Sequence, residues 1–556
     1  MGMRSVNVCL FFVAIFVFCG CGKGKQPTPV TPVPPASFTF SGLKVNGVYN
    51  GFIYKGVNST PVIKISFSTA VNHTSVSGAL TFINNTGASV NFSTAYLNHD
   101  STIVITPSAL QSITPYTLNI STSLKSAAGG SLQSAIAVNL TTAVDTINKF
   151  PVVTDSQLLD IVQKQTLKYF YDFGHPVSGL ARERNTSGDV VTMGGSGFGI
   201  MAMVAGVNRQ FITRAQGLAR MQLIVAFLLK AQTFHGAFPH WMNGATGAVV
   251  PFSTQDDGAD LVETAYLMEG LLTARQYFSQ NTTAETQLRT DINTLWNNVE
   301  WDWFTQGGQN TLYWHWSPNY GWSSNMQING WDEALITYVL AASSTTHPIT
   351  KAVYDNGWAG NGSMKNGHTY YNTVLPLGPP DGGPMFFAHY SFLGINPNGL
   401  SDAYASYDVQ NKAHATINYN YCVANPNGYY GYGANCWGLT ASDTQTGYNA
   451  SSPTSDLGVI APTAAIASLP YTPTQSLQAL RFFYYKLGDK MWGPYGFYDS
   501  FSLDTPWFGT SDLAIDEGPI MDMIENYRSG LLWNLFMSCP EVKTGMKGLG
   551  FTGPNL

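Results

Sequence analysis

The feature that most limits the fold of this chain is a change of hydrophobic period near Asp155. Before it, short segments alternate apolar and polar residues, as half-buried strands do. After it, apolar residues recur every three or four positions, as on one face of a helix. The 556 residues can also form more than one core. The sequence therefore predicts a multidomain protein, with an all-β domain followed by an all-α domain.

The first 36 residues predict export and anchoring. Arg4 precedes an apolar run, 6–18, that is too short to cross a bilayer as a helix, and Cys19-Gly20-Cys21 follows. This pattern resembles a lipoprotein signal at 1–20, with Cys21 lipidated; an ordinary secreted protein cleaved nearby is the alternative. Residues 21–36 are rich in proline and predict an extended spacer. We expect a lipid-anchored protein of the bacterial cell envelope, facing the periplasm or the cell surface.

Residues 37–146 have the pattern of a β-sandwich. Turn residues separate short alternating segments at the spacing of such a fold. The segments are 62–67, 80–83, 102–106 and 116–120. Their sequences resemble those of bacterial Ig-like modules in cell-surface proteins. The region carries no cluster of carboxylates or histidines, so we expect a spacer or docking domain, with glycan binding as the alternative.

Residues 150–545 predict a ring of helices. Long loops rich in glycine, asparagine and aromatic residues separate the helical segments, which suits an (α/α) barrel with an active-site pit at one end. A stacked solenoid is the alternative, but no fixed repeat is visible. The expected helices are one starting near 158, then 215–231, 259–278, 284–299, 332–342, 402–418, 461–469, 476–487 and 519–537.

The composition excludes some functions and favours others. A net charge of −6 and few basic residues disfavour nucleic-acid binding. The 13 tryptophans and 29 tyrosines suit stacking against sugar rings. No Cys/His spacing predicts zinc, and we expect no metal or organic cofactor. Cys422 and Cys436 are either a disulfide or buried thiols. We expect a monomer.

Four carboxylates cluster within 256–263, although only 11% of the chain is charged against about 25% in ordinary domains. If the helix begins at Ala259, then Asp256, Asp260 and Glu263 share one face. Carboxylates held close in a poorly solvated site have their proton affinities pushed apart, which suits acid and base chemistry. The alternative is a capped helix start at Asp256 or Asp257.

Two further acidic pairs are expected near helix starts. Glu333 precedes a strongly apolar run, and shielding by Trp331 could raise its pKa enough for a general acid. Asp332 is as well explained as a capping residue. Asp516 is the better candidate for a base, and Glu517 beside it is the alternative.

Several loop residues suit a saccharide pit. The glycine run at 194–199 lacks the strand and lysine of a nucleotide loop, so we attribute it to close helix packing or substrate approach. Each tryptophan alone is as well explained as a core residue. With the three acids of the cluster, the candidate substrate-binding residues are Arg184, His240, Trp241, Trp316, Trp331, Tyr390 and Trp437.

Six motifs in one order resemble glycoside hydrolase family 144, the bacterial "glucoamylase-like" family, over about 156–537. The resemblance implies an (α/α)6 toroid and an inverting endo-β-1,2-glucanase that yields sophoro-oligosaccharides. It also implies Glu333 as the general acid and Asp516 as the base, with Asp256, Asp260 and Glu263 shaping the cleft. The motifs lie at 180–184, 194–199, 257–264, 333–338, 437–443 and 516–533.

Other activities stay open from the sequence. An exo-acting hydrolase would release sophorose or glucose, and loop closure at the pit decides between the two modes. A non-catalytic envelope lipoprotein would bind glucan without cutting it. A lyase acting on a uronate polymer is disfavoured, because the acidic clusters would repel an anionic substrate.

Overall fold

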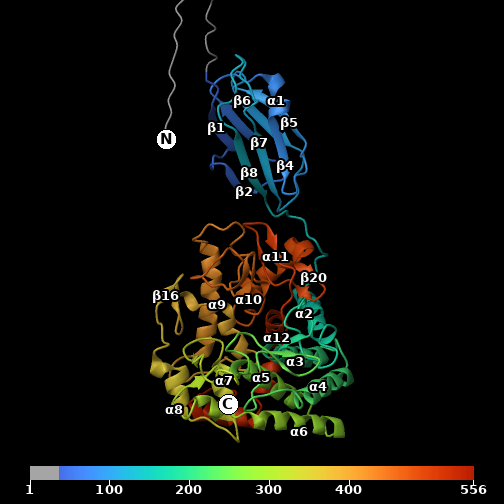
Figure 1. Ribbon diagram of the computed structural model, residues 1–556, viewed down its shortest axis with the longest axis vertical. Coiled ribbons are helices and arrows are strands. Elements are labelled where there is room, and N and C mark those ends of the chain that lie inside the picture. Colours follow the sequence, from blue (N-terminus) through green and yellow to red (C-terminus); the bar gives the residue numbers. More distant parts are fainter. Residues whose placement is uncertain (1–36) are drawn as a thin grey trace, which may run out of the picture.

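The computed structural model describes residues 37–556, so the predicted signal, Cys21 and the whole predicted spacer lie outside the described residues. Figure 1 shows a β-domain and a larger helical domain joined by one stretch of chain. The predicted fold class, an Ig-like sandwich followed by an (α/α)6 toroid, is confirmed. Within the described part, no helix combines the length and the apolar content that a bilayer span requires.

The β-domain is a sandwich of two four-stranded sheets. Along β3, Ile63, Ile65 and Phe67 point inward while Lys64 faces solvent, which is the predicted alternation. The first sheet has the order β1 (Phe40–Val45), β3 (Ile63–Phe67), β6 (Thr102–Pro107), β5 (Phe92–Leu97). The second has the order β2 (Ile53–Val57), β8 (Ile136–Thr142), β7 (Pro115–Ile120), β4 (Leu80–Asn84). The short helix α1 (His73–Ala79) precedes β4.

The helical domain has inner helices that are buried on most sides and outer helices that have one solvent-exposed face. The inner elements are α3 (Met193–Asn208), α5 (Leu261–Tyr277), α7 (Leu335–Ser343), α10 (Pro462–Ile466) and α12 (Ala514–Ser529). The outer helices are α2 (Asp155–Tyr171), α4 (Arg214–Leu228), α6 (Thr283–Asn298), α9 (Tyr407–Ala424), α11 (Pro473–Met491) and α14 (Pro540–Leu549). Inner helix α3 contacts both α5 and α12, and α14 covers α7.

Short elements connect the helices and carry much of the site. The helical ones are α8 (Lys351–Val353), α13 (Leu531–Phe536) and the 3-10 turns η5 (Met385–Ala388) and η6 (Tyr390–Phe392). The strand pairs used below involve β9 (Val190–Thr192), β10 (Trp241–Asn243), β12 (Ala259–Asp260), β14 (His315–Trp316), β18 (Ala441–Thr444), β19 (Gly447–Ala450), β22 (Phe501–Ser502) and β23 (Trp507–Phe508).

The glycine run of α3 packs against two neighbouring helices. A Cβ at Gly197 would collide with the carbonyl of Tyr266 on α5. A Cβ at Gly195 would lie 2.6 Å from the Cβ of Ala514, the first residue of α12. Close helix packing, one of the two explanations offered for this run, is therefore what the structure supports.

The starts of several helices differ from the sequence-based expectation, and three of them bear on the loops around the helices. Helix α7 begins at Leu335 instead of 332, and α9 begins at Tyr407 instead of 402 because the Asp402 carboxylate first closes a turn onto Tyr404 and Ala405. Helix α12 begins at Ala514, ahead of Pro519, and ends at Gly530, where φ is 66°. The expected start at Pro519 is therefore wrong, because Pro519 lies inside α12.

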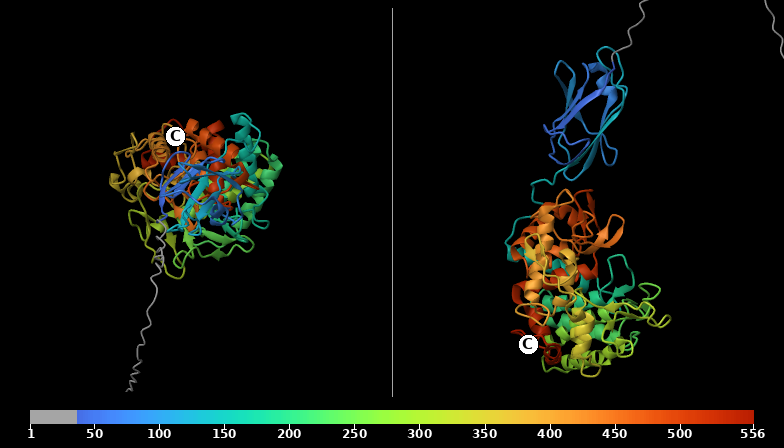
Figure 2. Two further views of the ribbon diagram at one scale, coloured as in Figure 1. Left: turned by 90° about the horizontal axis from the view of Figure 1, so that it is seen from above. Right: turned by 90° about the vertical axis from the view of Figure 1, so that its left-hand side faces the viewer.

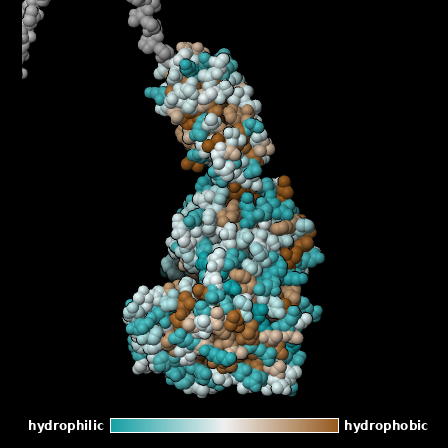
Figure 3. Space-filling model, turned by 45° about the vertical axis from the view of Figure 1, so that its right-hand side comes forward, coloured by the Kyte–Doolittle hydropathy of each residue, from teal (hydrophilic) through white to brown (hydrophobic). Residues whose placement is uncertain are grey.

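The two domains touch at their junction. Lys55 of β2 lies 2.6 Å from the Asp504 carboxylate, and the backbone N–H of Val144 donates to the Tyr430 hydroxyl at 3.3 Å. Figure 2 shows the same stacked arrangement from the side, and Figure 3 shows a mainly hydrophilic surface with small, separate apolar patches. Cys422 and Cys436 are free, buried thiols, which answers the question of a disulfide between them.

Two carboxyl groups are fully buried between the inner helices. Glu269 of α5 accepts the backbone N–H of Gly394 at 2.8 Å, while neither oxygen of Asp522 on α12 has a hydrogen-bond partner. Burial raises the pKa of both groups well above the ordinary range, and the charge of Glu269 adds to the effect on Asp522. Burial thus favours the neutral form of each carboxyl group.

We predict that this burial makes the protein less stable as the pH rises. Between the low unfolded pKa and the raised folded pKa, the native state binds more protons, so stability falls by up to about 1.4 kcal/mol per pH unit for each group. Asp522→Asn should flatten the dependence of Tm on pH between 5 and 9, measured by calorimetry. Parallel curves for the variant and the parent would contradict this account.

Candidate active site

Tyr390 lies between two groups of acids that come from opposite sides of the inner ring. Its ring packs on Phe198, Tyr266 and Phe386, and the side chain is 6% exposed. Burial and the charges of Asp516, Glu333 and Glu263 raise the pKa of its hydroxyl well above the ordinary value. Tyr390 therefore forms the floor of the site, with acids on both walls.

The first wall is the predicted cluster, but its acids do not share a helix face. Asp256 lies in a turn bridged to Ser253, and Asp260 ends β12 and caps α5. The Oδ1 atom of Asp260 accepts the backbone N–H groups of Val262 and Glu263 at 3.0 and 2.9 Å. The prediction of one helical face was wrong, because the helix begins at Leu261 and not at Ala259.

Glu263 joins this wall from the first turn of α5. Its Oε2 atom accepts the backbone N–H of Gly194 at 2.6 Å and the Thr192 hydroxyl at 3.3 Å. Burial raises its pKa, although the charge of His240 opposes the shift. The start of α3 thus holds Glu263 in place.

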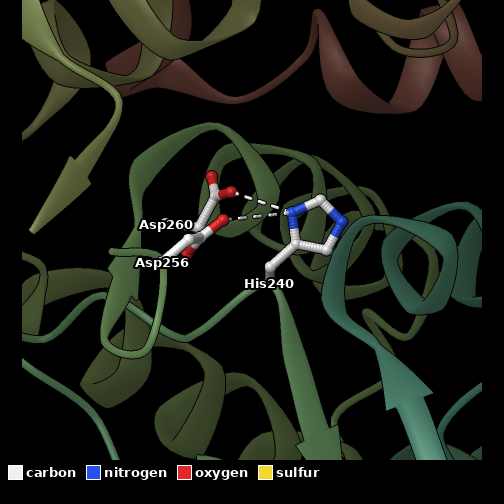
Figure 4. A group of neighbouring side chains, drawn as sticks. All are labelled: His240, Asp256 and Asp260. Carbon is white, nitrogen blue, oxygen red and sulfur yellow. Dashed lines mark hydrogen bonds and ion pairs between the residues drawn. The ribbon is translucent and has the colours of Figure 1, made fainter. Parts of the chain in front are cut away.

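Two histidines hold the three acids of this wall together. His240 Nδ1 lies 3.0 Å from Asp260 Oδ2 and 4.0 Å from Asp256 Oδ2, as Figure 4 shows. His315 Nδ1, from β14, lies 3.2 Å from the same Asp256 oxygen. Burial alone would lower the pKa of His240. The negative charges of Glu263, Asp260 and Asp256 outweigh this effect and raise the pKa to about 9.

The same atoms are close enough to be tested as a metal site. Ligand atoms of His240, Asp256 and Asp260 lie within 4.8 Å of one another. An imidazole must be neutral to bind a metal, yet the pKa values of both histidines are raised by the surrounding carboxylates. The group is better described as two histidines whose pKa values are raised by a set of carboxylates, that of His240 to about 9.

Glu333 lies in the turn before α7, beside this wall. Its carbonyl accepts the hydroxyls of Tyr266, at 3.2 Å, and of Ser391, and so fixes the turn. Burial raises the pKa of its carboxyl to about 7, and the charges of Glu263 and Asp260 contribute. A carboxyl group with this pKa is protonated at mildly acidic pH and can donate a proton.

The second wall contains Asp516, in the first turn of α12, with Asp499 and Asp443. Asp516 and Asp499 are each 4% exposed, and their side chains are within hydrogen-bonding reach of each other. Burial and the charges of Asp499 and Asp443 raise the pKa of Asp516 well above the ordinary value. The positive charge of Arg184, whose guanidinium lies 3.2 Å from Asp443, lowers the pKa of Asp516 and so opposes that shift.

A hollow of about 500 Å³ opens beside the second wall. Arg184, Asp443 and the half-exposed Tyr448 line it together with Trp507 of β23. Burial of the Tyr448 hydroxyl and the charges of Asp516, Asp499 and Asp443 raise its pKa well above the ordinary value. An aromatic ring and several hydrogen-bonding groups make this hollow suitable for a sugar residue.

The structure buries two of the predicted substrate contacts and packs a third, the partly buried Trp316, against neighbouring rings. Trp437 is fully buried, and its indole N–H donates to the Gln475 carbonyl at 3.3 Å. Trp331 is 4% exposed among Trp358, Phe392 and Tyr407. Trp316 packs on Phe234 and Trp303, because on β14 it points away from the face that His315 presents.

The remaining candidates lie around the pit or behind it. Trp241 packs edge-on against His240 and Phe252, next to the first wall. Glu517, the alternative base, is 1% exposed and lies beside Thr166, behind Asp516.

Sequence reasoning missed Asp499, Tyr448 and Trp507. Asp443 lies in the motif at 437–443, and His315 lies between two tryptophans in a loop suited to sugar contacts, so each has a signal in the sequence. Asp499 lies just before the short strand β22, with no helix start or acidic neighbour to mark it. Only the fold brings it to Asp516.

Two groups of acids beside a buried tyrosine, in a domain of inner and outer helices, fit the class of glycoside hydrolases. Comparisons with known proteins support this class. Residues 325–540 match the family model described as "Putative glucoamylase", and residues 54–142 match the model of a bacterial Ig-like domain. The chain belongs to this glucoamylase-like family, glycoside hydrolase family 144.

Three relatives show how close the similarity is. A "putative glucoamylase" of Bacteroides uniformis is 54% identical, with a TM-score of 0.72, over 73% of this chain and all of that one. An endo-β-1,2-glucanase of Chitinophaga pinensis is 49% identical, with the same TM-score and coverage. An exo β-1,2-glucooligosaccharide sophorohydrolase of Parabacteroides distasonis is 47% identical over 71% of this chain, and the match spans 58% of its own length.

Proposed function

We propose that this protein hydrolyses linear β-1,2-glucan within the chain, with inversion at the anomeric carbon. The observation that carries the proposal is the pair of walls across Tyr390, one with a protonated Glu333 and the other with Asp516. The endo-β-1,2-glucanase of Chitinophaga pinensis, 49% identical, supports the substrate and the mode.

The two walls fit the chemistry of inversion. Glu333 donates its proton to the glycosidic oxygen of the leaving sugar, directly or through a substrate hydroxyl. Asp516 takes a proton from the water that attacks the anomeric carbon from the other face. Inverting enzymes keep the two carboxyl groups about 6.5 to 9.5 Å apart to admit that water. The reaction needs no oxidation and no cofactor.

Exo action is the second candidate, because a relative of nearly equal identity is an exo-acting sophorohydrolase. The two modes differ in their first products. Endo action on a long β-1,2-glucan gives a range of sophoro-oligosaccharides early, whereas exo action gives one small sugar from the start. Chromatography of early digests separates these modes.

We predict that Glu333→Gln and Asp516→Asn each lower the rate of reducing-sugar release from linear β-1,2-glucan by at least about 100-fold. Both variants should keep the parent Tm, because the substitutions are close to isosteric and remove a buried charge or proton. Near-normal turnover by either variant would remove that residue from the mechanism. Glucan binding without any reducing-sugar release by the parent would instead indicate a non-catalytic binding protein.

We predict that kcat/KM, measured as a function of pH, decreases on the basic side with an apparent pKa near 7. The general acid must be protonated, and burial raises the pKa of Glu333 to about 7, so activity falls as the pH rises through that value. Glu263→Gln removes one of the charges that raise this pKa, and should move the basic limb to lower pH by about one unit or less. A limb that stays in place would show that another group controls it.

We also propose that the protein is a monomer tethered to the bacterial envelope through a lipid on Cys21. The support is the apolar run at 6–18 followed by Cys19-Gly20-Cys21 and a proline-rich spacer. We predict that the expressed full-length chain takes up radiolabelled fatty acid and enters the detergent phase, and that Cys21→Ser abolishes both. Labelling of the Cys21→Ser variant would contradict lipidation at this residue.

A further inference from the structure

One short hairpin connects the hollow beside the second wall with the junction between the domains. This hairpin, residues 501–508, consists of β22 and β23 and pairs Ser502 with Trp507. Trp507 lines the hollow, and Asp504 lies in the turn between the two strands. A contact made at the turn therefore bears on the ring that faces the hollow.

Asp504 ties the turn of the hairpin to both domains. Its Oδ2 atom lies 2.6 Å from the ammonium of Lys55 on β2, and its Oδ1 atom accepts the backbone N–H of Tyr430 at 2.8 Å. The side chain of Asp504 is 12% exposed and that of Lys55 is 39% exposed. An ion pair with one exposed partner is weak by itself. Here the same carboxylate also holds the backbone beside it in place.

The β-domain packs on the same region through apolar contacts. The ring of Tyr430 lies against the backbone of Gly56, where φ is 66° and a Cβ would come within 2.5 Å of the ring. The backbone N–H of Val144 donates to the Tyr430 hydroxyl at 3.3 Å. Ile113 of the β-domain belongs to the same buried apolar cluster as Leu503, which lies in the turn of the hairpin. The ion pair therefore lies at the edge of a packed contact.

The segment that joins the two domains is fixed to α11. The backbone N–H of Lys149 donates to the Tyr485 carbonyl at 2.7 Å, and that of Val153 donates to the Tyr485 hydroxyl at 3.1 Å. The ring of Phe150 packs on that of Tyr484, with centroids 4.6 Å apart. These contacts and those at Asp504 together hold the β-domain in one position against the helical domain.

We propose that the β-domain braces the substrate-binding hollow, and that Lys55 and Asp504 are positioning residues that hold Trp507 against the bound sugar. The turn of the hairpin is tied to the hollow a second time, because the side chain of Gln445 donates to the Thr505 hydroxyl at 2.7 Å. Gln445 lies in the turn between β18 and β19. This inference rests on the proposed function, because it requires that the hollow holds a sugar residue of the substrate.

The brace acts on binding and leaves the chemical step alone. A sugar in the hollow contacts Trp507 before and during bond cleavage, so a displaced ring weakens the ground state and the transition state alike. A loss of this kind raises KM and leaves kcat nearly unchanged. A general loss of folded enzyme would instead lower the apparent kcat.

Charge reversal at residue 55 tests the brace in the full-length protein. In Lys55→Glu, two carboxylates face each other where an ion pair stood, and like charges in contact repel. We expect KM for linear β-1,2-glucan to rise at least about fivefold, with kcat within about twofold of the parent. Lys55→Arg keeps the positive charge and should leave KM within about twofold of the parent value.

Lys64→Glu is the matched control, because Lys64 is an exposed lysine of β3, in the sheet that does not contain β2. It should leave KM within about twofold of the parent value. Adding Asp504→Asn to Lys55→Glu should restore KM, since the NH2 group can donate to the introduced carboxylate while the amide oxygen still accepts from Tyr430.

The path through Trp507 has its own test. In a Trp507→Ala background the ring is already lost, so Lys55→Glu should cause no further rise in KM. The full rise in that background would overturn the proposal, and so would an equal rise in Lys64→Glu or an unchanged KM in Lys55→Glu.

Fluorine NMR of the substrate-free protein tests the brace without activity. The chain has 13 tryptophans, and in protein grown with 5-fluorotryptophan the signal of Trp507 is the one missing from Trp507→Phe. Lys55→Glu should shift or broaden this signal, adding Asp504→Asn should return it, and Lys64→Glu should leave it in place. An unchanged Trp507 signal in Lys55→Glu would overturn the proposal. The spectra need no substrate, so failure of the brace and failure of β-1,2-glucan cleavage are told apart.

Discussion

The close contact of α3 with α5 and α12 is the constraint on which the site depends. Glycine at 195 and 197 lets the backbones approach so closely that any side chain there would meet Ala514 or Tyr266. The same approach brings the backbone N–H of Gly194 to Glu263 on one side and sets the first turn of α12, with Asp516, on the other. One glycine-rich helix start therefore fixes the distance between the two acid-bearing walls. A larger residue at either position would separate the walls before it touched any substrate.

The negative charge of the two walls is balanced in different ways. The wall with Asp256, Asp260 and Glu263 contains two histidines, and the carboxylates raise the pKa values of both. The wall with Asp516 has one arginine, already paired with Asp443, and so keeps part of its charge neutral by retaining protons. Glu333 lies close enough to the first wall to feel its residual charge, which contributes to a pKa of about 7. An acid and a base thus arise from the same residue type through different neighbours.

The sequence predicts most of the architecture and part of the site. The change of period near Asp155 gives both domains, because strand and helix periodicity depend on local burial. Glu333 and Asp516 are recognisable because each adjoins a strongly apolar segment. The predicted sugar contacts at Trp437 and Trp331 lie in the core instead. The sequence around a tryptophan in a polar loop does not show whether its ring faces a sugar or the core. Asp499 carries no local signal at all: its role depends on a partner in another element, and that contact exists only in the folded chain.

Asp260 has two duties that mutagenesis cannot separate by rate alone. One oxygen closes the first turn of α5, and the other holds His240. Replacing such a capping residue by alanine costs about 0.5 to 2 kcal/mol of stability in other proteins. A slow Asp260→Ala enzyme would therefore combine a frayed helix with an altered electrostatic field, and its residual rate would measure neither. Asparagine keeps the cap oxygen but puts an NH2 group where an oxygen accepts from His240, so its kinetics report the loss of that charge and hydrogen bond without a frayed helix.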